Sequence, residues 1–427
     1  MQLVILGVVL LLTLMIGVPL VFCLGFTSLV YILVFANVPL SIIVQRVFAG
    51  SNSFTMMSAP LFMLAALLMD RAGISDSIMK LSEAIVGRIK GGLSAVNIVF
   101  SMIFAGISGT AQADTACVGG MMIPAMLDKG YDKEYAAAVT AASSTIGIII
   151  PPSTPMIYYG VLTGLSISSL FIAGVVPGIL IGIGMLIVST VISARRNYES
   201  NTRRYTIKER LLAVAQAWPP LVMIVIIIGG ILGGVFTPTE AAAVAALYAL
   251  FVGLFITKKL KTRDLPSVLK DAAAMTGSVM IIIAVSDLLG WVITNARIPQ
   301  TLILPLIQNF QGGQAMFLWI VSIILIIAGV FLHGTAMLVV IVPLFLPAVG
   351  ALGINALQFA MVVIMCWGIG QQTPPVGSAL YICCQMADVD MYEITKANIP
   401  FLAVLMGILA LIIHVPAVVT WLPALLG

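Results

Sequence analysis

Long stretches without charged side chains dominate the chain. No Asp, Glu, Lys or Arg occurs within residues 1–45, 135–194, 211–239 and 298–387. About 20 apolar residues are enough to cross the ~30 Å hydrocarbon layer of a bilayer, so each stretch can supply one or more membrane helices. The pattern predicts an all-α polytopic membrane protein. No charged region precedes the first apolar run, which favours a retained helix over a signal peptide.

Composition excludes several classes of protein. The 427 residues are 61% hydrophobic and only 8% charged, whereas a water-soluble protein has about a quarter of charged residues. The five cysteines lie in apolar segments without zinc-ligand spacing, which indicates helix packing. The apolar composition predicts that the protein is embedded in a lipid bilayer. No basic stripe alternates with aromatic residues, so we expect no nucleic-acid partner.

Two similar groups of residues recur about 225 positions apart. In each, Gly-Thr-Ala (109–111 and 334–336) precedes a diproline (151–152 and 374–375) by about 40 residues. The shared flanking residues are a double glycine upstream (91–92 and 312–313) and a serine and tyrosine downstream (Ser153 and Tyr158, Ser378 and Tyr381). Several matches in the same order indicate a duplication of about 200 residues.

Basic residues predict the orientation, because cytoplasmic loops are enriched in Lys and Arg. Six of the 20 basic residues lie within 195–210 and five within 258–270, so we expect both segments in the cytoplasm. If the repeats are inverted, residues 71–90 are cytoplasmic too, and only Arg46 and Arg297 lie outside. A parallel duplication would place 71–90 outside. We therefore predict inverted repeats and a periplasmic N-terminus.

Each repeat is expected to contain a re-entrant helical hairpin and a broken membrane helix. The first repeat covers 1–196, with the hairpin at about 93–127 and the broken helix at about 135–165. A cytoplasmic connector, 197–216, leads to the second repeat, 217–427, with its hairpin at about 314–350 and its broken helix at about 355–387. Irregular backbone at membrane depth has to be buried in protein or line a watery cavity, so these interruptions are candidate sites.

The diprolines free backbone oxygen atoms. Proline has no N–H to bond the carbonyl four residues earlier, so we expect free carbonyls at 147–148 and 370–371. Na⁺ is a hard cation that prefers oxygen ligands, and broken helices in transporters present carbonyls to ions. We predict one sodium site formed by Ser108, Gly109, Thr110, Gly147, Ile148 and Pro151, and a second formed by Gly334, Thr335, Gly370, Gln371 and Thr373.

A substrate is expected beside these ions. The uncharged segments offer no arginine to bind a carboxylate, so helix ends and small polar side chains would have to recognise an anionic substrate. The candidates are Ser108, Gln112, Asp114, Ser153, Thr154 and Ser378. Two roles stay open for Asp114: neutralising a cation, or a favourable position in the first turn of a helix.

Residues 74–89 predict an amphipathic helix on the inner membrane surface. The apolar positions recur at helical spacing (Ile74, Ile78, Leu81, Ile85, Ile89) opposite charged ones (Asp76, Lys80, Glu83, Arg88). We expect it to brace the molecule rather than to regulate it.

At these residues the sequence resembles the large membrane (M) subunit of tripartite ATP-independent periplasmic (TRAP) transporters, over essentially the whole chain. The resemblance rests on the Gly-Thr-Ala tips, the extension from Gln112 to Asp114, and the diprolines. It implies an elevator transporter of the ion-transporter superfamily, with a scaffold and a moving transport domain. It also implies sodium-coupled uptake of an organic acid (sialic acid or a C4-dicarboxylate), a small membrane (Q) subunit, a periplasmic substrate-binding protein, and location in the bacterial inner membrane.

Two other functions compete with this one. A self-sufficient sodium–carboxylate symporter would share the architecture and need neither partner. An intramembrane serine protease is suggested by Gly-Ile-Ser-Gly at 106–109, with His333 or His414 as the base. The protease would need serine and imidazole within hydrogen-bond reach, and it leaves the second Gly-Thr-Ala and both diprolines unexplained.

Overall fold

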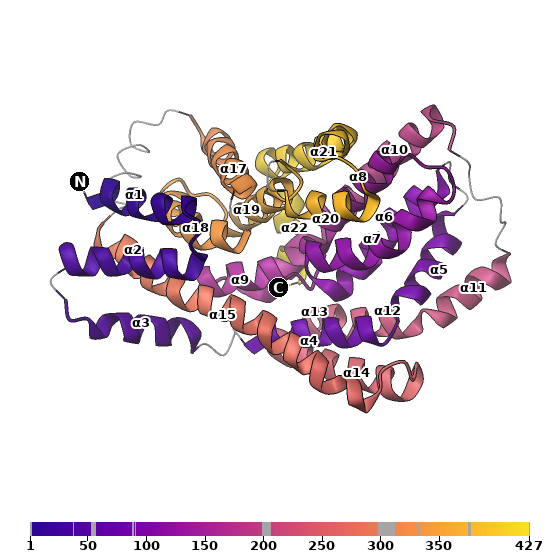
Figure 1. Cartoon of the computed structure of the whole chain (residues 1–427), viewed down its shortest axis with the longest axis horizontal. Coiled ribbons are helices and arrows are strands. Elements are labelled where there is room, and N and C mark those ends of the chain that lie inside the picture. Colours follow the sequence, from indigo (N-terminus) through magenta and orange to yellow (C-terminus); the bar gives the residue numbers. More distant parts are fainter. Residues whose placement is uncertain are drawn as a thin grey trace.

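The computed structural model describes residues 2–36, 38–52, 57–87, 89, 91–198, 206–297, 312–331, 334–374 and 377–426. Every regular element within these ranges is a helix (Figure 1). By length and composition, four described segments could cross a membrane: Ile167–Arg195, Pro238–Ile256, Thr262–Asn295 and Met391–His414. Ile207–Gln216 and Trp218–Leu232, which meet at a bend of 60°, would make a fifth. The all-α membrane fold is as the hydrophobic pattern predicts.

An outer group of helices comes from two distant parts of the sequence. Its members are α1 (Gln2–Met15), α2 (Leu20–Val34), α3 (Ser41–Ser51), α4 (Ser58–Arg71), α14 (Pro238–Phe251) and α15 (Leu265–Asn295). The long helix α15 packs against α2, α3 and α4, and α14 packs against α4 (Figure 1). Leu24 and Tyr31 from α2 meet Leu288 and Val292 from α15 in a buried apolar cluster. These contacts make the outer group one packed body.

A central group contains both predicted hairpins and both broken helices. From the first half come α6 (Gly92–Ser108), α7 (Ala111–Leu127), α8 (Lys133–Ser144), the 3₁₀ turn η2 (Thr145–Ile148), α9 (Thr154–Thr163) and α10 (Ile167–Arg195). From the second half come α17 (Gln314–Phe331), α18 (Gly334–Ala351), α19 (Ala356–Gly370), α20 (Ser378–Ala387), α21 (Met391–His414) and α22 (Ala417–Leu426). α8 packs against both α20 and α21, so the two halves interlock.

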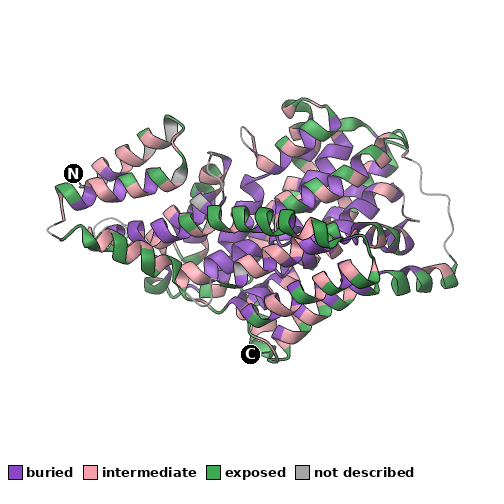
Figure 2. Ribbon diagram, turned by 60° about the horizontal axis from the view of Figure 1, so that its bottom comes forward, coloured by how far each residue is buried: buried purple, intermediate pink, exposed green. Residues whose placement is uncertain are grey.

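Helices α8 and α19 lie at the centre of this group. Every residue of α8 from Tyr135 to Ser144 is buried, and so is every residue of α19 from Gln358 to Gly370. Small side chains make this possible in α8, because Ala137, Ala138 and Ala141 let α7 and α20 approach closely. Figure 2 shows buried positions concentrated in the central helices. Each central helix therefore ends inside the molecule, where its interruption begins.

Two helices lie at the edge of the molecule between these groups. In α5 (Ser75–Val86), Ile78 and Leu81 are buried while Ile85 is 55% exposed, and the helix packs on α6. The amphipathic helix predicted at 74–89 thus directs part of its apolar face to protein rather than to lipid. The predicted connector contains a helix, α11 (Ile207–Gln216), which begins with a capping box formed by Thr206 and Glu209.

The remaining short elements complete the path between α11 and α15. They are α12 (Trp218–Ile224), the π-helical turn η3 (Val225–Gly229), α13 (Gly230–Leu232), the π-helical turn η4 (Val252–Ile256) and the 3₁₀ turn η5 (Thr262–Asp264). A second capping box, Thr237 with Glu240, starts α14. Glu240 therefore caps a helix.

Two segments predicted to be cytoplasmic lie side by side. Lys259 Nζ is 2.9 Å from Asp76 Oδ2, and Arg71 is 3.8 Å from Asp271 Oδ2. The loop before α15 therefore lies on the same side of the molecule as the start of α5. The inverted symmetry of the repeats stays a prediction.

Candidate functional site

The first hairpin turns within two residues. Gly109, at φ +64°, ends α6 in the left-handed conformation that glycine adopts without strain. Thr110 then caps α7, because its hydroxyl accepts a hydrogen bond from the Ala113 N–H at 3.3 Å. The backbone between the two arms is therefore the tip of a tight helix–turn–helix.

This tip packs directly on the first broken helix. The Thr154 N–H donates to the Gly109 carbonyl at 2.9 Å. A methyl group placed on Gly109 would lie 2.6 Å from the Pro152 carbonyl oxygen, and one placed on Gly147 would lie 3.2 Å from that of Thr110. The structure thus brings together the two halves of the first predicted sodium site, 108–110 and 147–151.

Part of the backbone freed by the diproline is satisfied internally. The Ser153 hydroxyl donates to the Ile148 carbonyl at 2.6 Å and accepts from the Met156 N–H at 3.3 Å, so it also caps α9. The serine predicted to bind substrate therefore has a structural use. Its contact with substrate, and that of Thr154, stay predictions.

The second broken helix is surrounded by close backbone contacts. A methyl group on Gly370 would lie 2.9 Å from the backbone of Gly329 in α17, and one on Gly334 would overlap the Trp367 ring. The Gly370 carbonyl accepts from the Thr373 N–H at 3.1 Å, and the Thr373 hydroxyl donates to Ile369 O at 2.8 Å. His333, Pro375 and Val376 lie outside the described residues, while the buried Thr335 follows Gly334 in α18.

Gln112 connects the first hairpin with the second broken helix. Its Nε2 is 3.4 Å from Gln371 Oε1 and 3.4 Å from Ser378 Oγ. One side chain of the first repeat thus contacts two residues of the second repeat, which lie 259 and 266 positions later in the chain. The predicted substrate residues Gln112 and Ser378 are brought together, next to a residue of the second predicted sodium site.

Several buried polar atoms near the tip lack a hydrogen bond of good geometry within the described part of the chain. Ser108 Oγ, both carboxylate oxygens of Asp114 and Gln371 Nε2 make no hydrogen bond of good geometry with any described residue. Asp114 is fully buried, and Ser108 is 7% exposed. A buried polar group without a partner costs free energy, and an unpaired charge costs far more. Their gathering at one place indicates a site for a ligand that supplies the missing interactions.

A cavity of about 600 Å³ opens beside the first tip, between the central and outer groups. Ser108, Thr110 and Cys117 line it from the hairpin, and Met63, Asp70 and Met275 line it from α4 and α15. Ser75 Oγ and Cys117 Sγ, which lie 3.1 Å apart, form part of its wall. The tip is therefore accessible from one side of the molecule.

Comparison with known proteins identifies the family. The model of the tripartite ATP-independent periplasmic transporter, DctM component, matches residues 7–418. This chain belongs to the DctM family of TRAP transporter large permeases. The C4-dicarboxylate TRAP transporter large permease of Vibrio cholerae is 36% identical over 96% of this chain and 95% of its own length. The sialic acid large permease of the same organism is 34% identical over 96% and 95%.

A third relative and two solved structures extend the comparison. The isethionate TRAP transporter permease DctMQ of Oleidesulfovibrio alaskensis is 32% identical over 95% of this chain and 64% of its own. The YdaH transporter of Alcanivorax borkumensis has a similar fold, with a TM-score of 0.68 and 12% identity over 89% of this chain and 88% of its own. Neisseria gonorrhoeae MtrF has a TM-score of 0.61 at 12% identity, over 90% and 84%.

These relatives are transporter permeases and not enzymes, so this DctM-family chain is a TRAP transporter subunit and the protease alternative falls. His414, proposed as a base for that alternative, accepts a hydrogen bond from Trp319 Nε1 at 3.2 Å. It therefore joins α21 to α17.

A buried polar network that the sequence pattern did not predict joins α6 to α8 in this DctM-family chain. The Asn97 amide donates to Thr140 Oγ1 at 2.6 Å, Ser143 donates to Asn97 Oδ1 at 3.1 Å, and Ser101 donates to Ser143 at 3.0 Å. The spacing of Asn97 and Ser101, one helical turn apart, was an available signal. The network fixes the first arm of the hairpin on the first broken helix.

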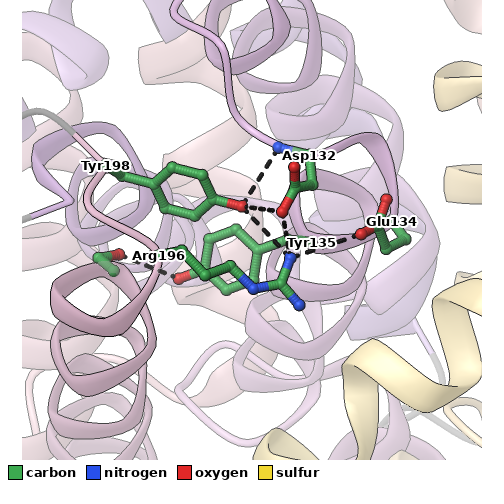
Figure 3. Close-up of polar contacts among 6 residues, drawn as sticks. Asp132, Glu134, Tyr135, Arg196 and Tyr198 are labelled. Atoms are coloured by element: carbon green, nitrogen blue, oxygen red, sulfur yellow. Dashed lines mark hydrogen bonds and ion pairs between the residues drawn. The ribbon is translucent and has the colours of Figure 1, made fainter.

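A second polar cluster of this permease lies at the opposite end of α8 (Figure 3). Arg196 Nη1 contacts Asp132 Oδ2 and lies 3.4 Å from Glu134 Oε1, while the Tyr198 hydroxyl donates to Asp132 at 2.5 Å. Burial, and then the hydrogen bond to the Asp132 carboxylate, raise the pKa of Tyr198 to about 12. The cluster joins the end of α10 to the start of α8 and is partly exposed. We assign it a structural role.

Proposed function

We propose that this TRAP large permease is the sodium-coupled, substrate-translocating subunit of a transporter that imports a small organic acid by an elevator mechanism. The proposal rests mainly on the polar environment of the first hairpin tip. There, buried polar atoms of Ser108 and Asp114, to which no described residue gives a hydrogen bond of good geometry, lie beside the interrupted backbone at 147–154. Na⁺ would supply the missing interactions, because it prefers hydroxyl, carbonyl and carboxylate oxygens.

The two predicted sodium sites have the ligand chemistry that Na⁺ requires. The first offers Ser108, Thr110 and backbone oxygens around Gly147, and the second offers Thr335, Thr373 and backbone oxygens around Gly370. Asp114 would balance the charge of an ion at the first site, since an unpaired carboxylate is costly inside a membrane. A bound ion would in turn make the site attractive to an anionic substrate held by Gln112 and Ser378.

The elevator mechanism is supported by the division into two groups of helices. The central group would be the transport domain, and the outer group the scaffold. The cavity of about 600 Å³ between them places Ser108 and Thr110 opposite Met63 and Met275. On the predicted topology it opens to the cytoplasm, because Asp70 in its wall precedes Arg71. Sliding of the central group would expose the same tip on the periplasmic side.

The substrate class and the partners follow from the family. The named relatives transport C4-dicarboxylates, sialic acid and isethionate, which are all organic anions. We propose that this chain takes a sialic acid or a C4-dicarboxylate, delivered by a periplasmic substrate-binding protein. It would work with a small membrane (Q) subunit in the bacterial inner membrane, with its N-terminus in the periplasm. The name DctMQ of the isethionate relative is consistent with such a pairing.

Sodium-driven uptake tests the proposal. Vesicles containing both membrane subunits would be given the binding protein and labelled organic acids, with an inward sodium gradient or with potassium replacing sodium. We expect uptake only with sodium. Thr110→Val and Thr335→Val should each weaken the sodium dependence, because each removes a hydroxyl oxygen from a predicted site.

Serine variants are the matched controls. Thr110→Ser keeps both the hydroxyl and the cap of α7, so it should retain the wild-type sodium titration, and Thr335→Ser should do the same. Sodium titrations unchanged in both valine variants would remove these hydroxyls from the proposed sites. Equal uptake by this chain without the binding protein would favour the stand-alone symporter.

A further inference from the structure

Gln372 makes a buried contact between the two broken helices that no predicted role uses. Its side chain is fully buried, and its Nε2 donates to the Ala141 carbonyl and, at 3.0 Å, to Thr145 Oγ1. Ala141 lies in the last turn of α8 and Thr145 begins η2 directly after it, whereas Gln372 follows the end of α19. One amide group therefore joins the point where the first central helix breaks to the point where the second one breaks.

The break in α8 creates the acceptor that Gln372 uses. In a continuous α-helix the Thr145 N–H would bond the Ala141 carbonyl, four residues earlier. Here the Thr145 N–H instead bonds the carbonyls of Ala142 and Ser143, as the chain tightens into η2. The Ala141 carbonyl is left to the Ser144 hydroxyl, at 2.7 Å, and to Gln372. Gln372 therefore gives the Ala141 carbonyl a second donor, which comes from the other half of the chain.

The amide oxygen and the backbone carbonyl of Gln372 are hydrogen-bonded as well. Asn398 Nδ2, from α21, lies 3.3 Å from Gln372 Oε1 and 3.4 Å from the Gln372 backbone carbonyl. Asn398 is fully buried. Because both the amide oxygen and the main chain of Gln372 are held, a shift of the backbone at 371–373 moves its Nε2 as well.

The surrounding packing leaves little room to absorb such a shift. A methyl group on Gly368 would lie 2.5 Å from Thr145 Cγ2, so the two broken helices are in direct contact one turn from the amide. Interiors packed this closely transmit displacement instead of deforming. Thr145 begins η2, which contains Gly147 and Ile148 of the first predicted site, and Gln372 lies between Gln371 and Thr373 of the second.

We propose that Gln372 is a positioning residue that couples the two ion sites, so that an ion at one site orders the backbone of the other. The inference rests on the proposed sodium coupling. Binding at the second site fixes residues 370–373, and through the Gln372 amide it fixes the end of α8 and η2. Coupling between sites is reciprocal, and it commonly changes affinity by about 5–150-fold. Gln372 therefore makes the two ions bind cooperatively.

The test compares two buried glutamines of the same helix region. Gln372→Ala removes the coupling amide. Gln358→Ala is the matched control, because Gln358 is 2% exposed and also donates two hydrogen bonds, at 3.0 Å each, to the carbonyls of Ile412 and Ile413 in α21. It lies at the other end of α19, away from both breaks. Thr145→Val, which removes one acceptor and keeps the side-chain shape, is a second and milder variant.

Two sodium titrations are measured on each protein. One is sodium-dependent uptake by vesicles containing both membrane subunits and the binding protein, and the other is the sodium-dependent rise of the unfolding temperature of purified protein. For wild type we expect a Hill coefficient above one. Gln372→Ala should lower it to about one and raise the half-saturating sodium concentration by about 5–150-fold, with Thr145→Val changing both in the same direction. Gln358→Ala should keep wild-type cooperativity even if it unfolds at a lower temperature.

Three outcomes would overturn the inference. The first is a wild-type Hill coefficient in folded Gln372→Ala, or in Thr145→Val if the alanine variant does not fold. The second is an equal loss of cooperativity in Gln358→Ala, which would show that any buried cavity in this region has the effect. The third is that neither uptake nor the unfolding temperature of the wild type changes with sodium concentration. That result would refute the proposed sodium coupling itself.

Discussion

Gly109→Ala tests whether close packing of the first hairpin tip on the diproline backbone is essential. The substitution has two separable costs. Alanine at φ +64° costs about 1–2 kcal/mol, because its Cβ approaches the backbone in the left-handed conformation. In addition, the new methyl group would lie 2.6 Å from the Pro152 carbonyl oxygen, so the tip or the diproline segment has to move.

The second cost follows from what that movement breaks. The Thr154 N–H donates to the Gly109 carbonyl at 2.9 Å, and Thr154 is 7% exposed. Loss of this bond would leave a buried donor unpaired, at about 1–3 kcal/mol. Since every 1.4 kcal/mol is a factor of ten, the intact tip should become about 5–150-fold less populated, beyond the backbone strain alone.

Gly164→Ala provides the matched control. Gly164 also has a positive φ, +76°, but a methyl group there would meet no atom within 4 Å. It therefore carries the backbone strain without the collision. We expect both variants to unfold at lower temperatures than wild type, and only Gly109→Ala to lose sodium-dependent uptake and sodium-induced stabilisation in the same vesicles and detergent. Equal uptake by the two variants would refute the idea that the tip has to fit this closely.

Two further predictions concern local structure and orientation. Ser153→Ala should lower the unfolding free energy by about 1–3 kcal/mol, because the Ile148 carbonyl loses its donor and α9 its cap; chemical denaturation of purified protein measures this, and a change below about 0.5 kcal/mol would show that water replaces the hydroxyl. Asp76→Cys and Lys259→Cys, at positions whose side chains form an ion pair, should both react with a membrane-impermeant thiol reagent from the cytoplasmic side only. Labelling from opposite sides would refute the predicted topology.

The sequence located the elements of the candidate site because local chemistry specifies the turns and helix breaks that form it. The tip at 108–110 is visible as small and polar residues between two apolar runs, and the structure has a helix on each side of it. The diprolines mark the breaks of the central helices for an equally local reason, since proline lacks the N–H that a helix needs. The family resemblance rests on the same residues, and the match of the DctM family model over residues 7–418 confirms it.

Other features required long-range information. The structural use of Ser153 depends on the direction of its hydroxyl, which donates to the Ile148 carbonyl. The amphipathic pattern at 74–89 predicted the helix but not its partner, because an apolar face can pack on lipid or on α6 equally well. Nothing local distinguishes Gln372 from other polar residues near a proline. Its role depends on its contact with Ala141, 231 positions away in the chain.

The sequence by itself determined that this chain is a helical membrane protein of the TRAP large permease family. The reason is that the hydrophobicity of a segment, and the effects of proline and glycine on the backbone, depend on residues close together in the chain. Only the tertiary structure decided which buried polar groups have hydrogen-bond partners among the described residues. Asp114 and Gln372 are both polar residues in apolar surroundings, yet Gln372 has partners from α8 and α21, while no described residue gives the Asp114 carboxylate a hydrogen bond of good geometry. That difference depends on how helices from the two halves of the chain pack together.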